Sequence, residues 1–238
     1  MEHSYWSMLS FGDTGWGDEF LSGFWLTLEI SFCAYCVSFV FGLLGAAAKL
    51  GPFRALRAIG TGYTGLVRSL PELLLLLLLY YVVANHLEIL LRSSGLVSET
   101  FQVSPFLAAV FALAFVCGAF MTEVLRAAYI SVPAGQTAAG RALGLSTWQI
   151  QRFVIFPQLI RAAVPGMGNL WLAITKESAL VSILGNFHEV LYAGYRAAAN
   201  TKEYIFFYTF TALIFLFITI VSMIALRILE NRLNRGFE

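Results

Sequence analysis

Very few charged side chains fall inside the apolar stretches of this sequence, and those few could attract a charged solute. Glu72 precedes a run of seven leucines, and Lys176 and Glu177 lie together in a later apolar stretch that also holds Asn169. An ionisable side chain inside a membrane helix costs about 2.5–3.5 kcal/mol on insertion scales, so it is usually kept for a function. We therefore predict that these four residues line the path of a polar solute.

Two interpretations of Glu72 are open. Ser69 and Glu72 have the spacing of a capping box, in which the glutamate bonds back to the start of its own helix. Arg68 lies four residues before Glu72, a spacing that allows an ion pair. Alternatively, the carboxylate faces the path and attracts a cationic side chain or an amino group. In either case Arg68 and Pro71 would shape the start of this helix or a gate beside it.

Lys176 and Glu177 also allow two interpretations. Adjacent residues point about 100° apart on a helix, so the two cannot pair well with each other. They could line the outer gate or the path, or they could snorkel or pair with other helices. Upstream, a proline and small residues either break the helix or let neighbouring backbones approach closely: Pro165, Gly166, Gly168 and Asn169.

No pattern of catalytic or metal-ligating residues stands out. The three histidines have no partner at metal-ligand spacing, and no nucleophile can be paired with a base. Cys33 and Cys36 have the CxxC spacing but lie in an apolar stretch, where we expect them to pack helices. The chain lacks the GxxxxGK(S/T) phosphate loop and so has no ATP site of that type. We predict that it is not an enzyme and holds no metal or cofactor of its own.

The elements that must position these residues are membrane helices. Of 238 residues, 59% are hydrophobic and 12% are charged, about half the charged fraction of a soluble domain. The net charge of +1 gives no reason to expect nucleic-acid binding. A span needs about 20 mainly apolar residues. The sequence offers five such stretches, at about 21–48, 70–87, 105–121, 162–184 and 204–226.

The positive charges between these stretches predict the topology. Eleven Lys and Arg residues fall on one side of the five spans and three on the other, and positively charged loops stay in the cytoplasm. We therefore expect an all-α integral membrane protein with five transmembrane helices, the N-terminus outside and the C-terminus in the cytoplasm. The expected divisions are an extracytoplasmic segment at 1–19, a membrane domain at 20–230 and a cytoplasmic tail at 231–238. No internal repeat is visible, so the chain should pair with itself or with a relative.

One cytoplasmic loop, at about 131–158, has a pattern typical of two short helices. Pro133 suits the first turn of a helix, and Gly144 suits the left-handed position that ends one. Ser146 and Gln149 then have capping-box spacing and start a second helix.

The second helix of this hairpin should present one apolar face. Ile150, Phe153 and Val154 recur at i, i+3 and i+4, and Pro157 should end the helix because the residue before a proline is pushed out of helical geometry. The hairpin either lies flat on the cytoplasmic membrane surface or docks as a ridge in a groove of a partner. The residues alone leave both interpretations open.

The hairpin resembles the cytoplasmic EAA loop of ABC importer permeases. In that loop an acidic residue and two alanines precede a glycine, and an aliphatic-x-Leu-Pro ending follows nine residues later. Here Gly144 is the glycine, and after nine residues the ending runs from Val154 to Pro157. Ala138 stands at the position of the acid and Gly140 at that of the second alanine, so this chain lacks the acid for a salt bridge to the ATPase.

Further segments resemble the polar amino acid permeases, in the branch of the histidine, lysine–arginine–ornithine and opine systems. These segments are GQTAAGRALGLS, FPQLIRAAVPGMGN and KESALVS, with an Arg-x-x-Pro signature at Arg68 and Pro71. The segment KESALVS departs from the family's usual motif, Lys-(Asp/Asn)-(Thr/Ser)-Ser-Leu, at Glu177 and Ala179. The resemblance covers about residues 20–230.

The resemblance implies the permease subunit of a binding-protein-dependent ABC importer in the bacterial inner membrane, with a MetI-like fold. The hairpin would be a coupling helix seated in a cytoplasmic ATPase dimer, which binds the ATP and Mg²⁺. A periplasmic or lipid-anchored binding protein would deliver a polar, basic amino acid or an opine, and the second permease subunit would be a related chain rather than a copy. The residues expected to couple to the ATPase are Ala138, Arg141, Gly144, Ser146, Phe153 and Pro157.

Two other classes of function are alternatives to the importer. An ion-coupled secondary transporter or channel subunit could use Glu72, Lys176 and Glu177 as a charge relay and would need no ATPase. An intramembrane enzyme is disfavoured because no paired catalytic residues are visible in the sequence.

Overall fold

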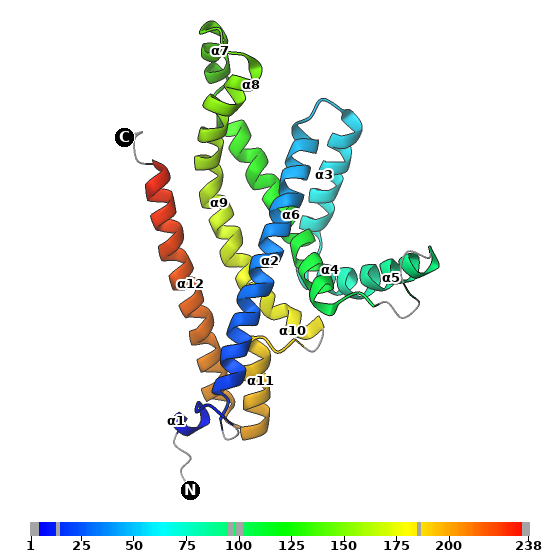
Figure 1. Ribbon diagram of the computed structural model, residues 1–238, viewed down its shortest axis with the longest axis vertical. Coiled ribbons are helices and arrows are strands. Elements are labelled where there is room, and N and C mark those ends of the chain that lie inside the picture. The colour runs from blue at the N-terminus through cyan, green and yellow to red at the C-terminus, as the bar shows by residue number, and fades with distance from the viewer. Residues whose placement is uncertain (1–4, 13–14, 95–97, 99–101, 185–186, 235–238) are drawn as a thin grey trace.

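Four long helices run along the long axis of the molecule, side by side over much of their length (Figure 1). They are α2 (Gly17–Leu50), α6 (Pro105–Ser131), α9 (Phe156–Glu177) and α12 (Tyr204–Asn234). The computed structural model describes residues 5–12, 15–94, 98, 102–184 and 187–234, and within these ranges it contains helices and connecting loops but no strand. The expected all-α fold class is therefore confirmed.

Shorter elements fill the connections between the long helices. They are α1 (Tyr5–Met8), α3 (Arg54–Ser69), α4 (Glu72–Leu77), the π-helical η1 (Leu78–Val83), α5 (Ala84–Ser93), α7 (Ala134–Ala142), α8 (Thr147–Gln149), the π-helical η2 (Ile150–Ile155), the 3₁₀ turn η3 (Ser178–Leu180), α10 (Val181–Leu184) and α11 (Val190–Thr201).

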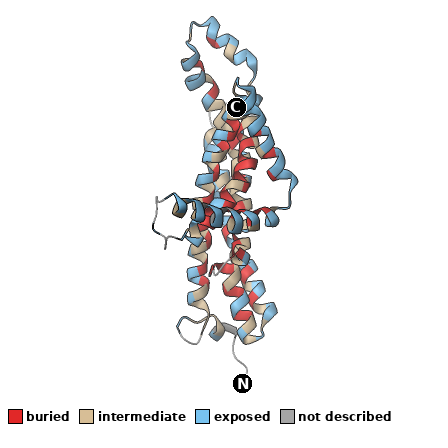
Figure 2. Ribbon diagram, turned by 90° about the vertical axis from the view of Figure 1, so that its right-hand side faces the viewer, coloured by how far each residue is buried: buried red, intermediate tan, exposed pale blue. Residues whose placement is uncertain are grey.

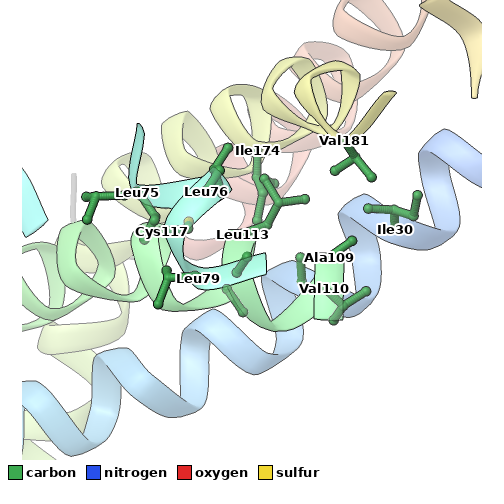
Figure 3. Close-up of a cluster of buried hydrophobic side chains, with 14 of the residues drawn as sticks. Ile30, Leu75, Leu76, Leu79, Ala109, Val110, Leu113, Cys117, Ile174 and Val181 are labelled. Carbon is green, nitrogen blue, oxygen red and sulfur yellow. The ribbon is translucent and has the colours of Figure 1, made fainter. Parts of the chain in front are cut away.

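The core lies where α2, α4, α6 and α9 meet. Figure 3 shows apolar side chains from these helices pointing toward one another, with Leu76 of α4, Leu113 of α6 and Ile174 of α9 among them. All three are at most 1% exposed. This contact places the start of α4 against the end of α9, although the two are far apart in the sequence.

Small residues allow α2 and α6 to pack closely. An added Cβ at Gly42 would lie 2.3 Å from Cγ of Met121, and one at Gly45 would lie 2.2 Å from Oγ1 of Thr122. Both distances are well below van der Waals contact, so the glycines are required by the packing. Close backbone approach through small residues is a common way for membrane helices to associate.

We predict that Gly45→Ala and Gly62→Ala change stability in opposite directions. Gly45→Ala should lower the free energy of unfolding in detergent by about 1–3 kcal/mol because it overpacks the α2–α6 contact. Gly62 has nothing within 4 Å of an added Cβ, so Gly62→Ala should raise it by up to about 1 kcal/mol through helix propensity. Denaturant titration of the two purified variants checks this, and a shift of the same sign in both would contradict the packing argument.

Three of the described helices are long and apolar enough to cross a membrane, namely α2, α6 and α12. A fourth candidate is α3 followed by the helical segment Glu72–Val82, but the chain bends by 115° between them. The predicted count of five spans stays a prediction, because α9, which covers most of the predicted fourth stretch, is not among these candidates. The helices that contain the predicted third and fifth stretches are longer than those stretches, since α6 continues to Ser131 and α12 to Asn234.

Residues 54–69 fall between the first two predicted stretches, where no helix is predicted, whereas the structure forms α3 there. Three glycines in this segment, at positions 60, 62 and 65, lower its helix propensity. Tertiary contacts compensate, because Gly60, Thr64 and Val67 are buried. Lys49 at the end of α2 also donates a 2.8 Å hydrogen bond to Thr64.

The predicted topology stays a prediction, and the helices near the two ends of the chain bear on it. Helix α1 and the last turns of α12 lie toward opposite ends of the long axis, and α7 and α8 lie at the same end as the last turns of α12 (Figure 1). This is the arrangement expected if the hairpin and the C-terminus share one side of the membrane. Residues 1–4 and 13–14 of the predicted outer segment and 235–238 of the predicted tail lie outside the described residues, and the tail's first four residues belong to α12.

Candidate functional site

The chain turns sharply at Pro71, about midway along the long axis, and α4 begins immediately after it with Glu72 (Figure 1). Pro71 precedes the helix because it has no N–H to donate and its preceding residue avoids helical geometry. Leu70 accordingly has extended dihedral angles, φ −103° and ψ 151°. A helix break at mid-depth is where transporters commonly bind their substrate.

Glu177, the last residue of α9, lies beside Glu72 in space. The two carboxyl groups come within hydrogen-bonding reach of each other, and both side chains are half-buried. Two of the four residues that the sequence assigned to the solute path are therefore brought together from distant parts of the chain.

This pair of carboxyl groups is suited to a cation. Ionised carboxylates only accept hydrogen bonds, so two of them in contact repel each other unless a proton or a cationic group lies between them. An ammonium or guanidinium group would satisfy both with charge-assisted hydrogen bonds. Lys176 is a positive charge close to Glu177, but its side chain is exposed.

The capping interpretation of Glu72 is wrong. The N-cap of α4 is Pro71, without a side-chain hydrogen bond, and the Ser69 hydroxyl donates instead to the carbonyl of Leu66. Arg68 forms no ion pair with Glu72 among the described residues; its guanidinium lies 5.6 Å from the ring centroid of Phe120. The break at Pro71 separates Arg68 and Glu72 into two helices, so the spacing of a continuous helix does not apply.

Asn169 is not part of the acidic pair. It lines a separate hollow between α9 and α12. Helix α9 also runs unbroken through Pro165, and its glycines serve close packing, since an added Cβ at Gly166 would lie 2.7 Å from Val124 of α6. Of the two interpretations of these small residues, close approach is confirmed and a broken helix is wrong.

The hairpin forms the joint that the sequence predicts. Gly144 follows α7 with φ +76°, in the left-handed region that favours glycine. The N–H of Leu145 donates to the carbonyl of Gly140 over 3.0 Å, and that of Gly144 donates to the carbonyl of Arg141, the hydrogen-bond pattern of a Schellman motif. Ser146 and Gln149 then form the predicted capping box.

The predicted end of the second helix at Pro157 is wrong. Helical structure continues from α8 through the π-helical η2 into α9, and Phe156 keeps helical dihedral angles of −58° and −44°. Pro157 is the second residue of α9, so it lies inside a continuous run of helical structure. The π segment before it bonds the N–H of Phe156 to the carbonyl of Gln151, five residues back, and so carries the chain past the proline.

The predicted apolar face also differs. Ile150 is buried, packing against Gly140, where an added Cβ would lie 2.8 Å from its Cγ1. Phe153 instead is 62% exposed, because the wider turn of η2 rotates it away from Ile150. The contact with Ile150 also explains why position 140 holds glycine rather than the second alanine of the EAA pattern.

Most residues at the end of the hairpin, at one extreme of the molecule, are exposed (Figure 2). Leu143, Trp148 and Phe153 are 80%, 68% and 62% exposed, and Ala138, Arg141, Gly144 and Ser146 are exposed as well. Arg152 lies about 6 Å from the ring centroids of Phe153 and Phe156. This surface combines apolar anchors with positive charge, which is typical of a protein-binding surface.

Two charged groups that the sequence analysis did not single out tie helices together. Glu123 of α6 pairs with Lys49 of α2 and, over 2.9 Å, with Arg126. Glu189, before α11, is fully buried. Its carboxylate accepts hydrogen bonds from Thr27 of α2 and from two N–H groups of α11, while burial raises its pKa above the usual range. Each acid falls outside the apolar stretches of the sequence, so its position does not predict that it is buried.

Comparisons with known proteins extend over nearly the whole chain. A family model described as "Binding-protein-dependent transport system inner membrane component" matches residues 38–235. The octopine transport system permease protein OccQ of Rhizobium radiobacter is 36% identical, with 98% of each chain covered. The histidine/lysine/arginine/ornithine transport system permease protein HisQ of Salmonella typhimurium (strain LT2) is also 36% identical, covering 94% of this chain and 97% of that protein.

A solved structure has the same fold. A chain of an amino acid ABC transporter, crystallised with histidines, superposes with a TM-score of 0.80 at 28% identity, covering 98% of this chain and all of that one. The fold expected from the resemblance is therefore confirmed.

Proposed function

The chain belongs to the family of binding-protein-dependent transport system inner membrane components, and we propose that it carries a basic amino acid or an amino-acid-derived opine across the membrane. As a member of this family it is a multi-pass subunit of the bacterial inner membrane and works with a binding protein and an ATPase. Its role is that of a transport permease.

The observation that carries the substrate class is the contact between Glu72 and Glu177. Two carboxyl groups meet at a helix break, and a cationic side chain is the group that both can bind. The name of HisQ includes lysine, arginine and ornithine, whose side chains are cations. Lys176 is adjacent to Glu177 and exposed. Its positive charge would repel a bound cationic substrate and so favour its release. Asn169, which the sequence predicts to line the path, lies in the separate hollow between α9 and α12 and has no role in this proposal.

The proposed mechanism is alternating access. A binding protein delivers the substrate to the outer face, and the substrate cation enters between Glu72 and Glu177. The hairpin tip, with Leu143, Trp148 and Phe153, seats in the ATPase. ATP and Mg²⁺ bind there rather than in this chain, and closure of the ATPase dimer moves the hairpin. Because η2 and α9 continue directly from the tip, that movement reaches Glu177 through one run of helix.

A second permease subunit completes the proposed path. We expect a related chain rather than a copy to face this one across the translocation path.

The test is ATP hydrolysis by the reconstituted complex of both permease subunits and the ATPase. We expect the binding protein loaded with a basic amino acid or opine to stimulate hydrolysis several-fold, and the empty binding protein to stimulate it less. An ion-coupled transporter would instead move substrate without the ATPase in response to an ion gradient. Uptake that persists without ATPase, with no stimulation by the binding protein, would overturn the proposal.

A further inference from the structure

A hollow of about 500 Å³ opens between the cytoplasmic halves of α9 and α12. Its apolar wall consists of Leu172 of α9 and Ile220, Met223 and Ile224 of α12. Its polar end consists of Arg227 and Glu230, farther along α12. None of these residues takes part in the acidic pair at Glu72 and Glu177.

The polar and apolar parts of the hollow are arranged along α12 in the same order as the headgroup and acyl chain of a phospholipid. Residues 220, 223, 224, 227 and 230 share one face of α12, and ten residues of helix span about 15 Å. The apolar part lies deeper along α12, and the charged part lies toward the C-terminal end, on the same side as the hairpin (Figure 1). A headgroup with the upper part of an acyl chain has this length and polarity.

Opposite charges lie side by side at the polar end. Arg227 and Glu230 are one turn apart, and neither forms an ion pair within the part of the chain that the structure describes. The arginine can bind a phosphate with two parallel hydrogen bonds. The glutamate can accept hydrogen bonds from an ammonium group close to that phosphate.

Contacts between the helices fix the depth of Asn169 in this hollow. The indole N–H of Trp171 donates to the Ser222 hydroxyl over 3.0 Å, and Gly168 lies against Leu226. Asn169 therefore lies between the levels of Ser222 and Arg227, below the charged end. A side-chain amide at that depth can donate a hydrogen bond to a glycerol ester carbonyl.

We propose that this hollow binds one phosphatidylethanolamine molecule of the cytoplasmic leaflet. Its phosphate binds Arg227, its ammonium binds Glu230, its ester carbonyl accepts from Asn169, and an acyl chain lies along Ile220 and Ile224. The orientation rests on the proposed function, which places the hairpin in the cytoplasm.

Charge complementarity and the surroundings of α12 favour this occupant. Only 6% of the most apolar stretch of α12 is buried in the chain, so an acyl chain can reach its apolar side chains. Phosphatidylglycerol would present no cation to Glu230. Phosphatidylcholine carries a quaternary ammonium that cannot donate a hydrogen bond.

The experiment uses the assembled transporter, purified from vesicles with equal amounts of phosphatidylethanolamine, phosphatidylcholine and phosphatidylglycerol of the same acyl chains. Native mass spectrometry counts the lipids retained per permease chain. We expect about tenfold preference for phosphatidylethanolamine in the unmodified protein. Glu230→Gln should bring its retention close to that of phosphatidylcholine, and Arg227→Gln should lower retention of all three. Arg232→Gln, on the same helix but outside the hollow, should change nothing.

Three results would overturn the proposal. One is equal retention of the three lipids by the unmodified protein, and another is an unchanged preference in Glu230→Gln. The third is a cross-link from Ile224→Cys to the second permease subunit, which would make the hollow an interface between subunits. ATP hydrolysis stimulated by the binding protein is measured on the same samples, so failure of the lipid site is distinguishable from failure of the transport function.

Discussion

Gly144→Asp should abolish ATP-driven uptake while the chain still inserts in the membrane. Gly144 has φ +76°, and nothing lies within 4 Å of an added Cβ, so an aspartate meets no clash within the chain. Aspartate also tolerates the left-handed region better than most residues. The harm arises at the partner surface, where a docked tip would bury an unpaired carboxylate at a cost of several kcal/mol.

Two control variants separate docking from folding. Gly144→Asn keeps a residue that tolerates the left-handed region but adds no charge, so it should retain a measurable part of the uptake. Gly135→Asp adds the same charge at an exposed glycine of α7 that also has nothing within 4 Å of an added Cβ; uptake should stay near normal. Uptake by vesicles and co-purification of the ATPase are both measured. Normal uptake in Gly144→Asp would show that the tip does not dock there.

Glu72→Gln should lower kcat/KM for cationic substrates by about 10- to 100-fold and affect neutral ones much less. A hydrogen bond to a charged group contributes about 1.5–3 kcal/mol, and each 1.4 kcal/mol corresponds to a factor of ten. Glu177→Gln should act in the same direction because its carboxyl group shares the contact. The double variant should lose less than the two single losses combined, since both carboxyl groups bind one cation.

The matched control is Glu29→Gln, which removes an exposed acid of α2 away from the break at Pro71. Transport rates of the unmodified protein and the four variants are compared over a range of substrate concentrations with one cationic and one neutral substrate. Equal losses for both substrates would count against direct electrostatic binding at Glu72. A loss in Glu29→Gln as large as in Glu72→Gln would point to a general effect of negative charge.

The sequence determined those features that depend on neighbours within about five residues. The capping box at Ser146 and the left-handed joint at Gly144 are closed by hydrogen bonds that span three to five positions, so the residue types alone specify them. The membrane class follows equally directly from composition, because water excludes long apolar stretches wherever they fold. The EAA spacing identified the family for the same reason, since it is a local pattern.

The tertiary structure decided which local preferences were kept. The glycines of α3 disfavour a helix, yet buried Gly60, Thr64 and Val67 hold one in place. Pro157 disfavours continuation, yet the π turn of η2 carries the helix through it. In both places contacts from distant segments, or a shift in hydrogen-bond register, outweigh a preference of about 1–3 kcal/mol.

The acidic pair depends most completely on tertiary structure. Glu72 and Glu177 were each visible as costly charges in apolar stretches, but nothing in the sequence joins them. The contact follows from packing of Leu76, Leu113 and Ile174 in the shared core, a sum of many weak contacts between helices that no single residue specifies. The sequence by itself therefore determined that acids are present in the membrane, and only the fold decided that two of them face one another.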